Sequence, residues 1–201
     1  MAYPYLIKTT NDMVVLANNV SASQTYSGKY FKLDADLDFS GESSTSPVGI
    51  NTRGTGSKPF CGVFDGNNHT IKNLTIDTNV MGCVGLFGFV GNSCILKNII
   101  LDESCKISCT TGSYIGSIVG YLSGGNVEIN NCVSAATVSG ARNVGGIVGG
   151  CTAEDNGYII KGCTFIGSAK SNSYVGGIIS QIANGTVENC KVSANIASTN
   201  R

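Results

Sequence analysis

The chain has 201 residues, of which 27 are glycine and none is tryptophan, and its 13 basic and 13 acidic residues give a formal net charge of zero. Because no stretch concentrates Lys or Arg, we expect no nucleic-acid partner. No apolar run approaches the ~18 residues needed to cross a bilayer, so we expect no membrane span, and the N-terminus lacks the layout of a signal peptide.

The first segment, residues 1–20, is expected to cap the N-terminal end of a single domain that covers residues 1–201. Thr10 is predicted to be the N-cap of a short helix. Its apolar residues recur at i, i+3, i+4 and i+7, which marks one face of a helix: Met13, Leu16, Ala17 and Val20.

The next segment, residues 21–83, is expected to supply opening strands and a first coil. Asp34, Asp36 and Asp38 alternate with apolar residues, which predicts three carboxylates on the solvated face of one strand. Alternate residues on a strand lie ~6.6 Å apart, too far for all three to bind one calcium ion. We therefore expect no metal site there.

The rest of the chain, residues 84–201, contains two markers that keep their order through four periods of roughly 30 residues. The first is a tetrapeptide found at Gly85–Gly88, Ser117–Gly120, Gly146–Gly149 and Gly177–Ser180. The second lies at Leu96–Ile99, Ile129–Cys132, Ile160–Cys163 and Val187–Cys190, with an earlier copy at Ile71–Leu74. Apolar residues alternate after the second marker, which predicts parallel strands stacked coil upon coil.

The second marker carries an asparagine at Asn73, Asn98, Asn131 and Asn189, and a glycine at Gly162. Asn and Gly are the residues that most readily adopt a left-handed backbone. We interpret this position as a corner of the coil. Stacked asparagines at such a corner are expected to form a ladder along the axis.

Cysteine follows that position in three successive coils, at Cys132, Cys163 and Cys190. The earlier copies have Leu74 and Ile99 there, so we expect a stack of thiols inside the core that behave as small apolar groups. The nine cysteines contain no Cys-x-x-Cys pair and the only histidine is His69, so no metal, cofactor or catalytic residue is assigned. Disulfides between some of the loop cysteines are kept as an alternative, because exported proteins are found in oxidising surroundings.

The tetrapeptides resemble the GLUG motif, named after Gly-Leu-hydrophobic-Gly, and the segment 64–74 (FDGNNHTIKNL) resembles the stretch that commonly precedes it. Residues 30–41 and 47–49 resemble the strand and turn that open such arrays. Ser117 and Ser180 depart from the motif. The resemblance implies an all-β fold, a right-handed parallel β-helix or solenoid of about five coils with a short N-terminal capping helix. It also implies an extracellular or cell-surface protein of the adhesin type.

The leading functional hypothesis is a non-catalytic structural or adhesive module that binds a glycan or a protein through its loops and lateral faces. The first alternative is a carbohydrate-active β-helix enzyme, which requires clustered carboxylates. Here the carboxylates are scattered, and the only close pairs are Asp102–Glu103 and Glu154–Asp155. An acid–base pair of Asp65 and His69 has no nucleophile associated with it.

The second alternative is assembly through the C-terminal end. No polar cap follows the last predicted strands, and an open solenoid end exposes unpaired backbone. We expect either that the protein continues or that this end pairs with another subunit to form a homo-oligomer or a filament. The residues expected at such a contact are Val187, Val192, Ala194 and Ile196.

Overall fold

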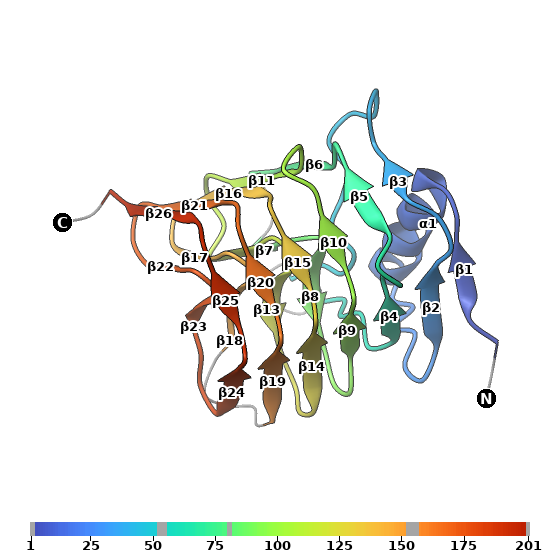
Figure 1. Ribbon diagram of the computed structural model, residues 1–201. Helices are drawn as coiled ribbons and strands as arrows, with labels where there is room; N and C mark the ends of the chain where they lie inside the picture. The colour runs from blue at the N-terminus through green and yellow to red at the C-terminus, as the bar shows by residue number, and fades with distance from the viewer. Residues whose placement is uncertain (1–2, 52–55, 80–81, 152–156, 200–201) are drawn as a thin grey trace.

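The strands of this protein stack into five sheets that run along one elongated molecule (Figure 1). The computed structural model describes residues 3–51, 56–79, 82–151 and 157–199. Every pair of named strands is parallel, and an isolated bridge between Ile50 and Lys58 is antiparallel. The predicted all-β solenoid of about five coils, with one helix near the N-terminus, is confirmed.

Sheets A and B form two adjacent sides. In spatial order, sheet A consists of β1 (Tyr5–Ile7), β2 (Tyr30–Leu33), β4 (Val63–Asp65), β9 (Ile95–Lys97), β14 (Val127–Asn130), β19 (Tyr158–Lys161) and β24 (Gly185–Glu188). Sheet B consists of β3 (Leu37–Asp38), β5 (Thr70–Lys72), β10 (Ile100–Leu101), β15 (Val133–Ser134), β20 (Thr164–Phe165) and β25 (Lys191–Val192).

Sheets C, D and E complete each coil. Sheet C contains β6 (Thr75–Asp77), β11 (Lys106–Cys109), β16 (Thr137–Gly140), β21 (Ser168–Ser171) and β26 (Asn195–Ser198). Sheet D contains β7 (Cys83–Val84), β12 (Tyr114–Gly116), β17 (Asn143–Gly145) and β22 (Val175–Gly176). Sheet E contains β8 (Phe87–Val90), β13 (Val119–Leu122), β18 (Val148–Cys151) and β23 (Ile179–Gln181).

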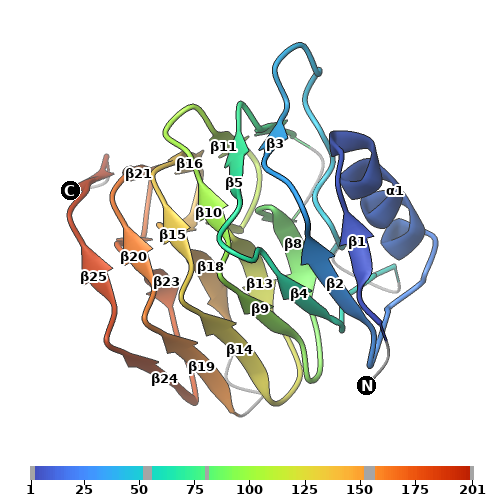
Figure 2. The ribbon, with the colours of Figure 1, turned by 45° about the vertical axis from the view of Figure 1, so that its right-hand side comes forward.

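The coils wind in a right-handed sense. In Figure 1 the chain rises through β9, β10 and β11 on the near side and returns through β13 on the far side while it advances towards the C-terminus. The turned view in Figure 2 places the same strands in the same order in depth. This handedness is the usual one for parallel strands joined by crossover connections.

Helix α1 (Thr10–Ser21) lies at the N-terminal end of the stack, beside β1 and β2 (Figure 2). Its N-cap is Thr9 rather than the predicted Thr10: the Thr9 hydroxyl accepts a hydrogen bond from the Asp12 amide at 3.2 Å, and the Asp12 carboxylate accepts one from the Thr9 amide at 2.9 Å. This reciprocal capping box depends on the acidic residue three positions later. The buried helix face consists of the predicted residues Met13, Leu16, Ala17 and Val20.

The core consists of columns of inward side chains, one from each coil. In sheet A the parallel register aligns Phe31, Phe64, Leu96, Ile129, Ile160 and Val187. All except Val187 are at most 4% exposed. Because side chains alternate between the two faces of a strand, an in-register stack buries one face of every coil against its neighbours.

The glycines of the repeated tetrapeptide bring sheets D and E into close contact. A Cβ added to Gly149 would lie 2.4 Å from the Gly120 oxygen and 2.5 Å from the Ile115 nitrogen. One added to Gly120 would lie 2.5 Å from the Val84 nitrogen. Where serine replaces the first glycine, the Ser117 hydroxyl donates a hydrogen bond to the Gly146 oxygen of the next coil. The motif therefore marks places where one backbone touches another.

Candidate functional site

The corner between sheets A and B is built from residues with left-handed backbone. Asn98, Asn131 and Asn189 each have φ of 53°, and Gly162 has φ of 64°. Their column is joined along the axis by backbone hydrogen bonds, in which the Asn98 amide donates to the Asn130 oxygen at 3.0 Å and the Asn131 amide to the Lys161 oxygen at 2.9 Å. These backbone hydrogen bonds join each coil to the next at the boundary of sheets A and B.

Asn73 lies at a different corner, so its alignment with the other three asparagines was wrong. Its φ is 57°, but it follows β5 of sheet B, and its side-chain amide donates to Asp38 at 2.8 Å. The register pairs Phe64 with Leu96, which places Gly66 rather than Asn73 in the column of Asn98. Segments 71–74 and 96–99 have similar sequences but lie on different sides of the coil. Aligning them by sequence therefore placed Asn73 in the wrong column.

Asp65 lies at the centre of a polar cluster at the sheet A corner. Its carboxylate accepts hydrogen bonds from the Tyr30 hydroxyl, the Asn98 side chain and the Asn67 amide, each at 2.9 Å, and it forms an ion pair with Lys97 at 3.2 Å. Asp65 is 7% exposed. Burial by itself would raise the pKa of this carboxyl, but the hydrogen bonds outweigh burial and hold the pKa below its ordinary value.

We expect Asp65→Asn to lower the free energy of unfolding by about 2 kcal/mol at pH 7, because the amide loses the ion pair and cannot accept all of these bonds. The lowered pKa means that the carboxylate stabilises the fold above about pH 4 and that this contribution is lost as the pH falls through the folded-state pKa. The difference between variant and wild type should therefore shrink at pH 3. Urea unfolding at both pH values measures it.

Asp34→Asn is the matched control, since Asp34 is an exposed carboxylate paired with Lys8 at 3.5 Å. This change should cost less than about 0.5 kcal/mol. Equal effects of the two substitutions would contradict the role given to Asp65.

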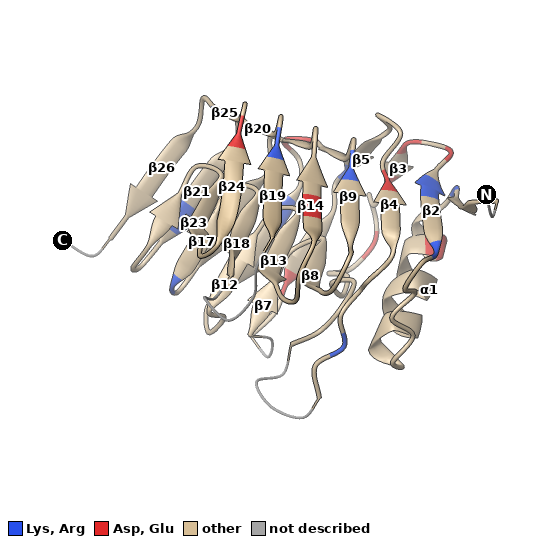
Figure 3. Ribbon diagram, turned by 90° about the horizontal axis from the view of Figure 1, so that it is seen from below, with Lys and Arg blue, Asp and Glu red and all other residues tan. Residues whose placement is uncertain are grey.

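A row of charged residues crosses the outer face of sheet A (Figure 3). In register it reads Lys32, Asp65, Lys97, Asn130, Lys161 and Glu188, of which Asn130 alone is uncharged. Neighbours pair between coils, as with Lys97 and Asp65 at 3.2 Å and Lys161 and Glu188 at 3.0 Å. A slip of one strand would separate these opposite charges, so the row favours the observed register.

The three cysteines expected in one column occupy successive coils of the core. Backbone hydrogen bonds join the three coils at this column: the Thr164 amide donates to the Cys132 oxygen at 2.8 Å and the Lys191 amide to the Cys163 oxygen at 2.9 Å. Cys132 and Cys163 are fully buried, and burial raises the pKa of the Cys132 thiol well above its ordinary value. The register aligns Cys132 with Ile99, but Leu74 aligns with Cys105 in another column, so the placement of Leu74 was wrong. None of the nine cysteines, all of which lie in the described ranges, forms a disulfide.

In the native protein, iodoacetamide should leave Cys132 and Cys163 unmodified, because alkylation requires an accessible thiolate. The half-buried Cys190 is the internal reference and should react faster. Peptide mass spectrometry after labelling with and without urea reads out each position. Labelling of Cys163 in the native protein at the rate seen in urea would contradict the buried column.

The structure separates the acidic residues that the sequence grouped together. Asp34, Asp36 and Asp38 do not share one strand face, because the chain leaves β2 after Leu33 and re-enters a strand only at Leu37. His69 Nδ1 lies 3.1 Å from Asp36 Oδ1 rather than beside Asp65. Glu154 and Asp155 lie outside the described residues.

The C-terminal end of the described stack exposes residues from core columns. Val187, Val192 and Ile196 are 40%, 46% and 38% exposed, and Ala194 is partly buried. Val192 continues the column of Phe165, and Ile196 continues that of Ala169. These are the residues expected at an end-to-end contact. Val187 of β24, Val192 of β25 and Ile196 of β26, with Ala194 between the last two strands, form an apolar surface, which we call the C-terminal face.

Sequence reasoning missed two adjoining hollows on the outer surface where sheet C turns into sheet D. The first has a volume of about 320 Å³ and is lined by Ser108, Cys109, Thr110, Ser139, Gly140, Ala141, Lys170 and Asn172. The second, of about 460 Å³, is lined by Ala141, Arg142, Asn143, Asn172, Ser173, Tyr174 and Gln181. We call the two together the C–D groove. Its residues lie in three coils, so no continuous motif could have revealed it.

The described part of the chain contains neither a cluster of possible metal ligands nor a helix that could cross a membrane. Across residues 3–51, 56–79, 82–151 and 157–199, no three His, Cys, Asp or Glu side chains gather in a way that could hold a metal ion. Within the same residues, α1 falls short of the length and apolar character that a membrane-crossing helix needs.

Comparison with known proteins supports the motif and the fold. The family model described as the GLUG motif matches residues 171–197. Halomucin from Haloquadratum walsbyi is 31% identical over 154 residues, and a protein from Evansella cellulosilytica, provisionally named a Gly-rich membrane protein, is 27% identical over 136. These matches cover 73% and 65% of the chain but only 2% and 14% of the two relatives.

A solved structure shares the fold. The crystal structure of a Bacteroides ovatus protein, provisionally named an immunoglobulin A1 protease, superposes with a TM-score of 0.65 over 98% of this chain and 78% of that one, at 21% sequence identity. Identity this low shows the fold alone. Together with the matched motif and the stacked parallel coils, it confirms the resemblance drawn from the tetrapeptides: this chain is a β-solenoid that carries the GLUG motif.

Proposed function

We propose that this chain is a non-catalytic structural and adhesive module of a surface-associated or secreted protein, and that it binds a glycan or a protein through its lateral faces. The names of the two relatives, halomucin and a Gly-rich membrane protein, support a surface location. The short share of each relative that the chain spans is consistent with one module within a larger protein.

The observation that carries the non-catalytic part of the proposal is that the carboxylates of three aspartates are occupied by hydrogen bonds within the protein. Asp38 accepts hydrogen bonds from Asn73 and the Ser40 amide, Asp36 binds His69 and the Thr70 amide, and Asp65 is enclosed in its corner cluster. These bonds tie one segment or coil to another. A glycosidase instead needs two carboxylates facing one substrate across ~5–10 Å.

An array of immobilised glycans and surface proteins tests this proposal. Labelled protein should be retained on a subset of spots, and the bound glycans should be recovered at their original length by mass spectrometry. Shortened glycans would show that the chain is an enzyme. Retention on no spot would remove the adhesive part of the proposal.

A second candidate function is self-association through the C-terminal face, and the exposure of Val187, Val192 and Ile196 favours it. Helix α1 covers the core at the opposite end. A head-to-tail fibre would have to seat the C-terminal face on that helix, whereas two C-terminal faces offer each other apolar side chains and unpaired strand edges. We therefore propose a two-fold dimer of residues 1–201.

Light scattering coupled to size-exclusion chromatography distinguishes these states. The dimer should form at high protein concentration and be abolished by Val192→Lys, while Val15→Lys, on the exposed side of α1, should leave it unchanged. A monomer at every concentration would overturn self-association, and species larger than a dimer would favour the fibre.

A further inference from the structure

We propose that the C–D groove binds an acidic saccharide, with Lys170 and Arg142 contacting its carboxylate or sulfate groups and Tyr174 packing against a sugar ring. This inference rests on the proposed function, because it names the face and the ligand class of the adhesive module. Three properties of the groove support it: its charge, its exposed aromatic ring, and its neutral polar groups.

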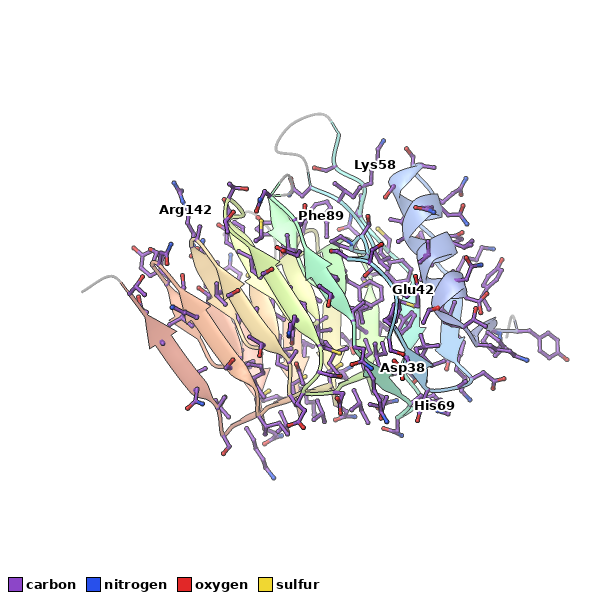
Figure 4. All side chains as sticks on the ribbon, turned by 90° about the horizontal axis from the view of Figure 1, so that it is seen from above. Asp38, Glu42, Lys58, His69, Phe89 and Arg142 are labelled. Atoms are coloured by element: carbon purple, nitrogen blue, oxygen red, sulfur yellow. The ribbon has the colours of Figure 1, made fainter. Side chains whose placement is uncertain are left out.

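The charge of the groove is positive and uncompensated within the described residues. Lys170 projects from β21, and Arg142 lies in the turn between β16 and β17, at the rim of the molecule (Figure 4). Neither cationic group forms an ion pair or a side-chain hydrogen bond with any residue of the described ranges, whereas Lys8, Lys97 and Lys161 each pair with a carboxylate. The groove therefore keeps two cations available for a ligand.

Carboxylates are absent from the lining of both hollows. The nearest one along the same row of sheet C is Asp77, which aligns with Ser108 and accepts a hydrogen bond from its hydroxyl at 2.7 Å. Towards the C-terminal end the row continues through Ser139 to Lys170. Across four successive coils the row thus changes from a hydrogen-bonded carboxylate to a cation with no partner among the described residues, which orients an anionic ligand towards the Lys170 end.

Tyr174 gives the groove an aromatic wall. Its side chain is 69% exposed, the highest value for a large apolar side chain outside the N-terminal Tyr3 among the described residues. It stands in the turn before β22, next to Asn143 of the preceding coil, because the register pairs Val144 with Val175. A tyrosine ring combines an apolar face with a polar end, which suits the mixed surface of a sugar.

The neutral groups of the groove suit a ligand that is rich in hydroxyls. The side chains of Asn143, Asn172 and Gln181 offer both donors and acceptors, and Ser139 and Ser173 add hydroxyls. The Asn143 side-chain amide donates to the Ser113 oxygen at 3.0 Å, which fixes this side chain in the lining of the groove. Fixed amides, two cations and one ring together match an acidic saccharide better than a nucleic acid, which requires a broader basic surface.

Isothermal titration calorimetry with tetragalacturonate as the acidic probe and maltotetraose as the neutral probe tests the site. Wild-type protein should bind the acidic probe at least about tenfold more tightly, and raising NaCl from about 0.05 M to about 0.5 M should weaken that binding. The double variant Arg142→Ala/Lys170→Ala should lose at least about tenfold in affinity, and Tyr174→Ala should lose affinity for both probes.

Lys29→Ala is the matched control, because Lys29 is an exposed cation at the far end of the molecule. It should bind as the wild type does, and circular dichroism should show that all variants are folded. Retained affinity in the double variant, or equal affinity for both probes, would overturn the groove site while leaving the adhesive function intact if the array still retains the protein. An absence of binding to every probe and every array spot would overturn both.

Discussion

Substituting Gly149 with valine should leave most of the chain unable to reach the native fold, and Gly149→Ala should lower the free energy of unfolding by about 3 kcal/mol or more. Gly149 belongs to a repeated tetrapeptide, where sheet E meets sheet D. The atoms closest to an added Cβ are backbone atoms of the neighbouring segments, at 2.4 Å and 2.5 Å. Backbone held in two ladders of hydrogen bonds cannot move aside as a flexible side chain would.

Urea unfolding followed by circular dichroism measures this effect, with Gly28→Ala as the control. Gly28 has φ of +69° but nothing within 4 Å of an added Cβ. Its substitution therefore carries only the cost of a left-handed alanine, about 1–2 kcal/mol. If Gly149→Ala proved as mild as Gly28→Ala, close backbone contact would not be the reason for the motif's glycines.

The second large effect is expected at Phe87, where Phe87→Ala should destabilise the protein by about 3–5 kcal/mol. The ring is fully buried and lies 5.2 Å from the centroids of both Phe60 and Phe64. It thus joins the segment before β4 to β4 itself and to sheet E. Removing it would leave a cavity that stacked backbone cannot collapse to fill.

Phe87→Leu keeps most of the volume and should cost about 1.5 kcal/mol or less. Thermal and urea unfolding of the pair give the difference. A loss below about 1 kcal/mol for Phe87→Ala would show that the N-terminal coils are held mainly by α1 and the backbone ladders.

The fold could be read from the sequence because each coil repeats one set of constraints. The glycines of the tetrapeptide and the left-handed Asn98, Asn131 and Asn189 recur at nearly fixed intervals, and both follow from local backbone requirements. In the first coils the second marker predicted the wrong position in the coil. Segment 71–74 has the letters of the second marker, yet it lies on sheet B, because the register of sheet A is set there by Phe64 and Asp65.

The candidate site was less accessible to sequence reasoning, since its residues become neighbours only through stacking. Lys170, Arg142 and Gln181 come from three different strands or turns and share no spacing with a known motif. The signals available in the sequence were only an arginine and a tyrosine about one period apart, Arg142 and Tyr174. Whether these two residues belong to one surface site depends on which side chains face outward, and the lengths of the turns determine which ones do.

The most direct test of the stacked coils is a set of methyl NOEs along one core column. Ile76, Ile107, Val138 and Ala169 are aligned in sheet C, one from each successive coil. With selectively labelled methyl groups, cross-peaks should join Ile76 to Ile107, Ile107 to Val138, and Val138 to Ala169. Strong cross-peaks that instead join methyl groups of sequence-adjacent strands in antiparallel pairs, with none between these residues, would contradict the solenoid.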